Sequence, residues 1–192
     1  MLTELIVRGA GGFFAFRNIV ISTRFKLLRR IYSVIYLLYL EQHSSYVGLD
    51  TIFKNKPWLP HGLSGIFISG YAVIGKDCVI FPNVVIGSNT LPDSKGYGAP
   101  CIGDNCIMGA GATIIGNVKV GDNCRIGANA TVFRDIPSNS TVAAAEPRII
   151  TKGNADTKFY LLRNNGWNYY QNGKLNLGTD PKILEKLKRK TR

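Results

Sequence analysis

The chain has 192 residues, with 24 Lys or Arg against 12 Asp or Glu, so its formal net charge at pH 7 is +12. This length fits one folding unit with additions at its ends. The charge favours an anionic partner such as a membrane surface, an acidic polysaccharide or a phosphate-bearing cofactor, with a generally solvated basic surface as the alternative. Nucleic acid is not expected, because no nucleic-acid motif is present and the basic residues of the repeat region are not interleaved with aromatics.

Residues 1–60 lack a sequence repeat and form the expected helical N-terminal segment, with a helix predicted over residues 24–41. The apolar run within it, Ile31 to Leu40, is ten residues long, whereas a membrane span needs about 20. No cleavable leader is recognised. The helix is expected to cap the next domain and pack in an oligomer, or to touch a membrane surface peripherally through its basic residues. Those residues are Arg24, Lys26, Arg29 and Arg30.

Aliphatic residues then recur every six positions, a period that neither an α-helix nor a simple strand gives. A six-residue repeat indicates a parallel β-helix, in which each hexad supplies one short strand and one turn, and three hexads close a coil of about 18 residues. The sequence therefore predicts such a domain over residues 61–150. The repeating residues are Ile68, Ile74, Ile80, Ile86, Ile102, Met108, Ile114, Val120, Ile126 and Val132.

The repeat has one interruption, because the residue expected at position 92 comes only at Ile102. The extra residues must leave the coil as a loop, Leu91 to Cys101, and loops on a rigid scaffold often carry function. Residues 151–192 form a C-terminal extension. Turn signals at residues 164–166 and 171–173 separate short aromatic strands there, and a basic helix or tail begins at Pro181.

The four cysteines point to no metal site, since there is no CxxC pair or Cys/His cluster. Cys78, Cys106 and Cys124 occupy the small inward position of the hexad and are read as buried apolar residues, while Cys101 lies at the end of the loop. Free cysteines suit a reducing compartment. The expected location is therefore the cytoplasm, with the inner face of the membrane as a second option through the basic helix.

The stretch from His61 to Ile150, about half the chain, resembles the hexapeptide-repeat acyltransferases, and within them the serine acetyltransferase-like branch. The loop is similar to acetyltransferases found among capsule and exopolysaccharide enzymes. The resemblance implies a left-handed β-helix, a homotrimer with active sites between subunits, and acetyl-CoA as cosubstrate. It is carried by HGLSGIFISGYAVIG (61–75), VVIGSNTLPDSKG (84–96), IGDNCIMGAGATIIGNVKVGDNCRIGANATVFRDIP (102–137) and EPRII (146–150).

His61 matches the family's catalytic histidine by its place just before the first full coil. A neutral imidazole can accept the proton of an alcohol as the alcohol attacks a thioester. A backbone N–H would stabilise the developing oxyanion. The resemblance implies direct transfer without an acyl-enzyme. His43 matches no motif and is expected at a helix end or on the surface.

Two positions depart from the serine acetyltransferase pattern. An aspartate that orients the catalytic histidine is expected fifteen residues before it, where this chain has Tyr46, and Asp50 is the nearest upstream carboxylate. A second histidine, associated with serine binding, is expected just before Pro100, where this chain has Ala99. Both departures favour a hydroxyl acceptor other than serine.

For acetyl-CoA, the resemblance implies a groove between neighbouring β-helices, lined by small residues against which the pantetheine arm lies. Ala110 and Ala128 match those positions, although tight turn packing would also select small residues. Arg134 and Arg148 match the cations expected near the CoA phosphates, and Lys152 adds charge.

The sequence thus predicts an all-β enzyme, an acetyl-CoA-dependent O-acetyltransferase that modifies a sugar hydroxyl of a surface polysaccharide or its precursor. Two alternatives stay open: a serine O-acetyltransferase of cysteine biosynthesis, and a non-catalytic β-helix that acts as a binding or scaffold protein. A carbonic anhydrase of this fold needs three metal-binding histidines, and the chain has two histidines in all.

Overall fold

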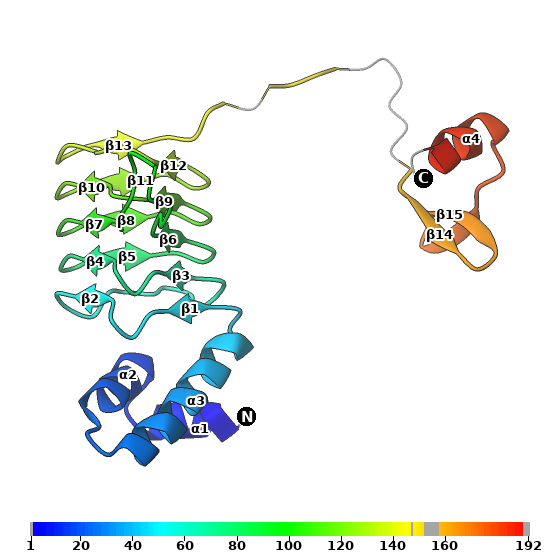
Figure 1. Ribbon diagram of the computed structural model, residues 1–192. Coiled ribbons are helices and arrows are strands. Elements are labelled where there is room, and N and C mark those ends of the chain that lie inside the picture. The colour runs from blue at the N-terminus through cyan, green and yellow to red at the C-terminus, as the bar shows by residue number, and fades with distance from the viewer. Residues whose placement is uncertain (1, 147, 152–157, 190–192) are drawn as a thin grey trace. The chain divides into compact units, whose positions relative to one another are not determined.

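The computed structural model describes residues 2–146, 148–151 and 158–189. The chain divides into two compact units, residues 1–146 and 147–192. The first unit contains three helices followed by a left-handed parallel β-helix, and the second contains a small antiparallel sheet and one helix (Figure 1).

The N-terminal helices are α1 (Leu2–Gly9), α2 (Phe13–Ser22) and α3 (Lys26–Gln42). Gly11 and Gly12 separate the first two, with φ angles of 91° and 94° that glycine adopts at little cost. The chain therefore turns sharply there, and α1 and α2 are bent by 81° to each other. Among the described residues, no single helix is long and apolar enough to cross a membrane; only this bent pair reaches that length and composition.

Two buried polar side chains join these helices to the first coil. Arg17 of α2 donates hydrogen bonds to the carbonyl oxygens of Leu49, at 2.7 Å, and Thr51. Tyr36 of α3 donates to the carbonyl oxygen of Val47 at 2.8 Å. Burial lowers the pKa of the Arg17 guanidinium and raises the pKa of the Tyr36 hydroxyl. The helices are thus fixed to the coil by hydrogen bonds as well as by apolar packing.

Three parallel sheets form the sides of the β-helix (Figure 1). Sheet A contains β1 (Tyr46–Val47), β3 (Phe67–Ile68), β6 (Val85–Gly87), β9 (Thr113–Ile115) and β12 (Thr131–Val132). Sheet B contains β2 (Ile52–Phe53), β4 (Val73–Ile74), β7 (Cys101–Ile102) and β10 (Lys119–Val120). Sheet C contains β5 (Val79–Ile80), β8 (Ile107–Met108), β11 (Arg125–Ile126) and β13 (Thr141–Val142).

The hexad residues fill the interior of this prism. Ile68, Ile86 and Ile114 stack in one column of sheet A, and each is at most 2% exposed. Stacking of successive coils removes these side chains from water, and truncating one to alanine costs about 2–5 kcal/mol. The expected β-helix is confirmed. Its parallel pairing begins at Tyr46, upstream of the expected start at residue 61.

The second unit holds β14 (Tyr160–Arg163), β15 (Gly166–Gln171) and β16 (Lys174–Leu177), paired in an antiparallel sheet, and α4 (Pro181–Arg189). The turns between its strands fall within the two segments that the sequence marks as turns. Residues 190–192 of the expected basic tail lie outside the described part of the chain.

Candidate active site

The prism has three edges where the chain turns from one sheet to the next. The C–A edge, between sheets C and A, contains residues 59–65, 81–84, 109–112 and 127–130. Backbone hydrogen bonds stack its turns. The N–H of Asn83 donates to the carbonyl of Ser64 at 2.9 Å, and the N–H of Asn129 donates to the carbonyl of Ala110 at 2.9 Å. Residues far apart in sequence are therefore brought into one column.

His61 lies in the lowest turn of the C–A edge and is exposed. Its ring centroid is 6.0 Å from that of Phe81 in the next turn. Within the described part of the chain, its side chain has no hydrogen bond or ion pair. An imidazole in this setting is free to accept a proton from a bound molecule. A cavity of about 240 Å³ adjoins this turn, lined by Trp58, Leu59 and Gly62 together with aromatic side chains of α2 and α3.

The two candidates for a partner of His61 lie elsewhere. Tyr46 is on β1, where its ring stacks on Phe67 with centroids 5.1 Å apart. Asp50 follows β1 at the A–B edge, between sheets A and B, which is the opposite edge of sheet A from His61. Within one chain the structure does not bring either side chain to the imidazole.

Ala110 and Ala128 are exposed and occupy equivalent positions of adjacent coils on the C–A edge. The edge carrying His61 thus continues upward as a strip of small residues, open to an extended ligand. Gly109 beside them has a packing reason, since a Cβ there would lie 2.8 Å from the backbone nitrogen of Ala128. The alanine side chains themselves are exposed, so packing inside the coil does not account for their small size.

The three predicted phosphate-binding cations are not all near that strip. Arg134 is exposed and follows β12 at the A–B edge, across sheet A from Ala110 and Ala128. Arg148 is exposed and belongs to the second unit, and Lys152 lies outside the described residues.

The interrupting loop leaves the coil at the A–B edge between β6 and β7. Asn89 and Gly98 close its base through two backbone hydrogen bonds of 2.8 and 2.9 Å. The loop and the coil beside it enclose a cavity of about 270 Å³, lined by Tyr71, Ser88, Asn89, Thr90, Tyr97 and Ala99 among others. Among the described residues, no cluster of three or more His, Cys, Asp or Glu is placed to hold a metal ion.

The loop and Ala99 are expected from the sequence, whereas the polar lining of this cavity is not. The signal available was the SNT segment at residues 88–90, directly after the last regular hexad before the loop. All three residues line the cavity, because the loop folds back on the coil. The Ser88 hydroxyl accepts a hydrogen bond from Ser69 Oγ at 3.0 Å, and the Asn89 amide donates to Ser94 Oγ at 2.7 Å. The N–H of Asn117 holds the loop there by donating to the carbonyl of Gly96 at 3.0 Å.

Known proteins match the repeat region. Residues 102–134 match the family described as bacterial transferase hexapeptide (six repeats). The serine acetyltransferase of Synechococcus elongatus is 37% identical over 93 residues, 48% of this chain and 37% of that protein. The Synechocystis serine acetyltransferase is 40% identical over 93 residues, 48% of this chain and 36% of that protein. This chain therefore matches well under half the length of these relatives.

A solved structure shows the same fold. Serine acetyltransferase isoform 3 from Entamoeba histolytica, in complex with cysteine, superposes with a TM-score of 0.59 at 26% identity. The superposition covers 73% of this chain and 49% of that one.

The expectation of a sugar acceptor from a capsule or exopolysaccharide is wrong. The relatives in sequence and in structure are serine acetyltransferases. They support the first alternative given above, a serine O-acetyltransferase. The sugar reading rested on Ala99 replacing a histidine and on the net positive charge, and neither feature specifies a sugar. A missing side chain removes one contact, whereas the cavity around Ala99 keeps other polar groups. The matched repeat, the left-handed β-helix and these relatives show that the repeat domain is similar in sequence and in fold to the hexapeptide-repeat transferases.

Proposed function

We propose that the protein transfers the acetyl group of acetyl-CoA to the hydroxyl of L-serine. The relatives named above supply the acceptor, because they are serine acetyltransferases. The observation that carries the reaction type is the shared edge: exposed His61 stands at the foot of an open strip that contains Ala110 and Ala128. A base beside an extended groove is the arrangement that attack on a CoA thioester requires.

In this mechanism His61 removes the proton of the serine hydroxyl as the serine oxygen attacks the thioester carbonyl carbon. The new C–O bond forms, the C–S bond breaks, and CoA leaves as a thiolate that takes the proton back from the imidazolium. The acetyl group passes directly to serine, so no residue of the chain is acylated. A backbone N–H at the site would stabilise the negative charge that develops on the carbonyl oxygen.

Acceptor binding is proposed for the loop cavity. The serine carboxylate and ammonium need polar partners, and Ser88, Asn89 and Thr90 line the cavity. Ser88 already accepts from Ser69 and Asn89 already donates to Ser94, so these two side chains would bind serine with their remaining hydrogen-bonding capacity. These groups would take over from the histidine that the family pattern expects at Ala99. No replacement is proposed for the aspartate expected at Tyr46.

A homotrimer would complete the site. His61 and the acetyl-CoA strip are on the C–A edge, whereas the loop cavity and Arg134 are on the A–B edge. In a ring with threefold symmetry, the C–A edge of one subunit can lie beside the A–B edge of the next. Light scattering should then give three times the chain mass of 21.1 kDa. A monomer at micromolar concentration would separate the two halves of the site and refute this arrangement.

The activity is tested by the release of free CoA thiol from acetyl-CoA in the presence of L-serine, D-serine or L-threonine. Release should depend on L-serine, and His61→Ala should lower turnover by about 100- to 10,000-fold, the usual contribution of a positioned general base. CoA binding should be kept, because His61 is not part of the alanine strip.

The matched control is His43→Ala. His43 ends α3, with its Nε2 3.6 Å from Glu4 Oε2, and is part of the helical packing. Its loss should leave turnover unchanged. Near-normal turnover of the His61 variant would refute the assignment of His61 as the base. Release of CoA thiol that does not depend on L-serine would refute L-serine as the acceptor.

A further inference from the structure

Helix α3 is apolar on two opposite sides. One side, with Tyr36, Tyr39 and Leu40, is buried against the rest of the unit. The other carries an exposed row at positions i, i+4, i+7 and i+11, which lie on one side of a helix. That row consists of Leu27, Ile31, Val34 and Leu38, and Leu27 is 72% exposed. A surface helix of a globular protein normally has one apolar side, so the second calls for a partner.

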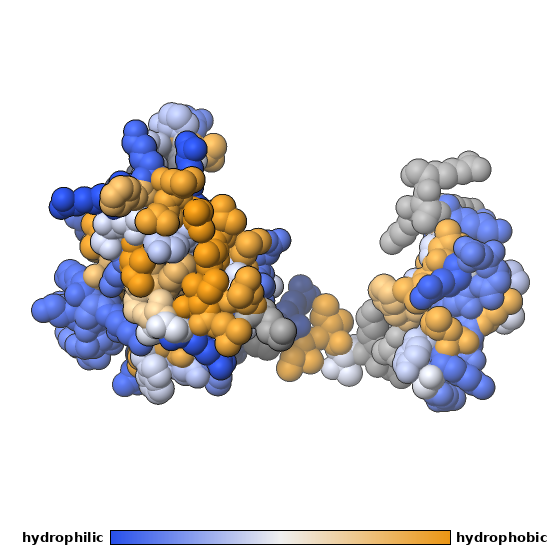
Figure 2. Space-filling model, turned by 90° about the horizontal axis from the view of Figure 1, so that it is seen from below, coloured by the Kyte–Doolittle hydropathy of each residue, from blue (hydrophilic) through white to orange (hydrophobic). Residues whose placement is uncertain are grey.

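The exposed row is part of a larger patch, which we call the helical patch. It also includes Phe25, 77% exposed just before α3, and Leu37. Figure 2 shows hydrophobic residues gathered over the helical end of the unit. Exposed leucines of α1 and isoleucines of α2 add to the apolar surface of the three helices. Monomeric soluble proteins rarely leave large apolar patches open to water, and such patches mark protein or membrane contacts.

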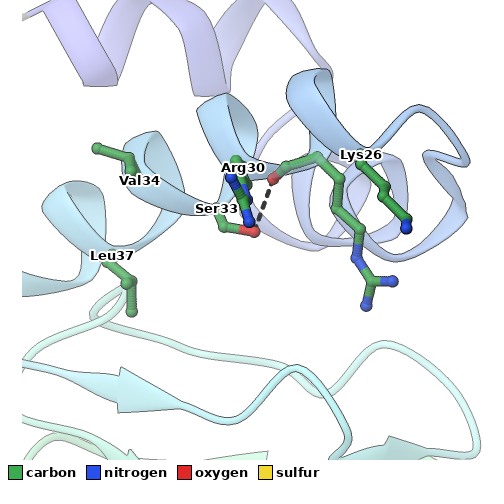
Figure 3. Close-up of a pocket in the computed structure, with 6 residues that line it drawn as sticks. Lys26, Arg30, Ser33, Val34 and Leu37 are labelled. Carbon is green, nitrogen blue, oxygen red and sulfur yellow. Dashed lines mark hydrogen bonds between the residues drawn. The ribbon is translucent and has the colours of Figure 1, made fainter.

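Cations border this patch. Arg24, Lys26, Arg29 and Arg30 are all exposed, and the first turn of α3 contains no acidic residue. Lys26, Arg29 and Arg30 line a shallow hollow of about 540 Å³ together with Val34 and Leu37 (Figure 3). Positive charge and apolar side chains therefore share one surface.

We propose that the helical patch docks on the surface of a membrane that contains anionic lipids. Apolar side chains would enter the boundary between headgroups and acyl chains, and the four cations would meet lipid phosphates. The helix would lie on the membrane, since α3 has 17 residues and no single described helix passes as a span. A second copy fits less well, because a twofold contact brings the same patch, with its own cations, against itself.

The test is co-sedimentation of the full chain with phosphatidylcholine vesicles that contain or lack phosphatidylglycerol. Binding should require phosphatidylglycerol and weaken as salt is raised. The double variant Lys26→Gln, Arg30→Gln should bind roughly 25-fold more weakly, since each cation near an anionic surface contributes about fivefold. Val34→Gln should also weaken binding, because it removes apolar surface from the same row.

The matched control is Lys119→Gln, Arg125→Gln, which removes the same charge from exposed positions on the β-helix. It should keep vesicle binding if the patch, and not the overall charge, is responsible. Equal loss in both double variants would overturn the proposal. An absence of vesicle binding would also overturn it. If, in addition, Val34→Gln breaks an oligomer seen by light scattering, the patch would be assigned to a contact with a second copy. Acetyl transfer is a separate readout, so failure here leaves the proposed reaction untouched.

Discussion

Replacing Arg17 by methionine tests whether hydrogen bonds hold the N-terminal helices on the β-helix. The guanidinium donates to the carbonyls of Leu49 and Thr51 and lies 5.1 Å from the ring centroid of Phe53. Methionine keeps an unbranched apolar chain, although a shorter one, and has no donor. The variant therefore leaves the carbonyls of Leu49 and Thr51, and the more distant carbonyl of Gly48 at 3.4 Å, without this partner. A buried polar group that loses its partner costs about 1–3 kcal/mol, or roughly 2–6 kcal/mol for the two close carbonyls of Leu49 and Thr51.

Part of that loss is offset, because the native site already disfavours the charge. Burial lowers the pKa of Arg17, and a neutral side chain avoids this desolvation. The net decrease in the free energy of unfolding should be about 2–4 kcal/mol, which lowers Tm by roughly 5–15 °C for a chain of this size. Thermal unfolding by circular dichroism measures this shift at one fixed protein concentration, since any subunit association also changes Tm.

Hydrogen exchange locates the effect. Protection should fall in α2 and in the first coil around Leu49, and should persist in the coils above. The control is Arg8→Met, which removes an exposed arginine that pairs with Glu4 four residues earlier, at 2.8 Å. Such surface pairs contribute about 0.3–0.5 kcal/mol. If Arg17→Met were as stable as the parent, packing alone would hold the helices and the argument would fail.

Two further predictions concern the CoA strip and pH. Ala128→Tyr should weaken CoA binding in calorimetry without lowering Tm, because the new side chain fills an exposed strip and not the interior. Lys119→Tyr on sheet B is the matched control and should bind CoA as the parent does. An unchanged CoA affinity of the Ala128 variant would place the groove elsewhere. Burial raises the pKa of Tyr36 in the folded protein above its ordinary value of 10.0. The neutral Tyr36 hydroxyl therefore contributes fully to stability below pH 10.0, and this contribution is lost as the pH rises above 10.0. Tyr36→Phe should therefore flatten the alkaline fall of the unfolding free energy measured by urea titration, and an equally steep fall would contradict the assignment.

The regular coils could be predicted from the sequence because each position repeats one physical requirement. An inward aliphatic residue every sixth position, as at Ile102 and Met108, is needed to fill the prism at every coil. The loop could be predicted for the same reason, since ten residues that break the period cannot stay inside it. The structure has the chain away from the strands over residues 88–100, close to the expected 91–101.

The first coil escaped prediction although its residues carry the same signal. Val47, Phe53 and Leu59 are six apart, but the next member, Ile68, comes three residues late. The structure absorbs the extra residues in the turn that carries His61, so partners across β1 and β3 are 21 residues apart instead of 18. A period search treats such a shift as the end of the repeat.

The helices before α3 and the lining of the loop cavity depend on tertiary contacts that a local pattern does not record. Phe13, for example, is ordered by stacking on Tyr36, with ring centroids 5.5 Å apart. Its position follows from α3 and not from its own neighbours in sequence. The residue that orients His61 could not be predicted from a local pattern either, because no described residue of one chain takes that role.

The inward cysteines give the β-helix an internal set of chemical probes. Cys78, Cys106 and Cys124 are buried in successive coils, and their thiols donate to the carbonyls of Gly103, Gly121 and Pro137 at 3.4, 3.1 and 3.2 Å. Cys101 is exposed and reduced. A thiol reagent should therefore label Cys101 at once and each inward thiol only when its own coil opens. The order of labelling would then report, coil by coil and without any substitution, from which end the solenoid comes apart.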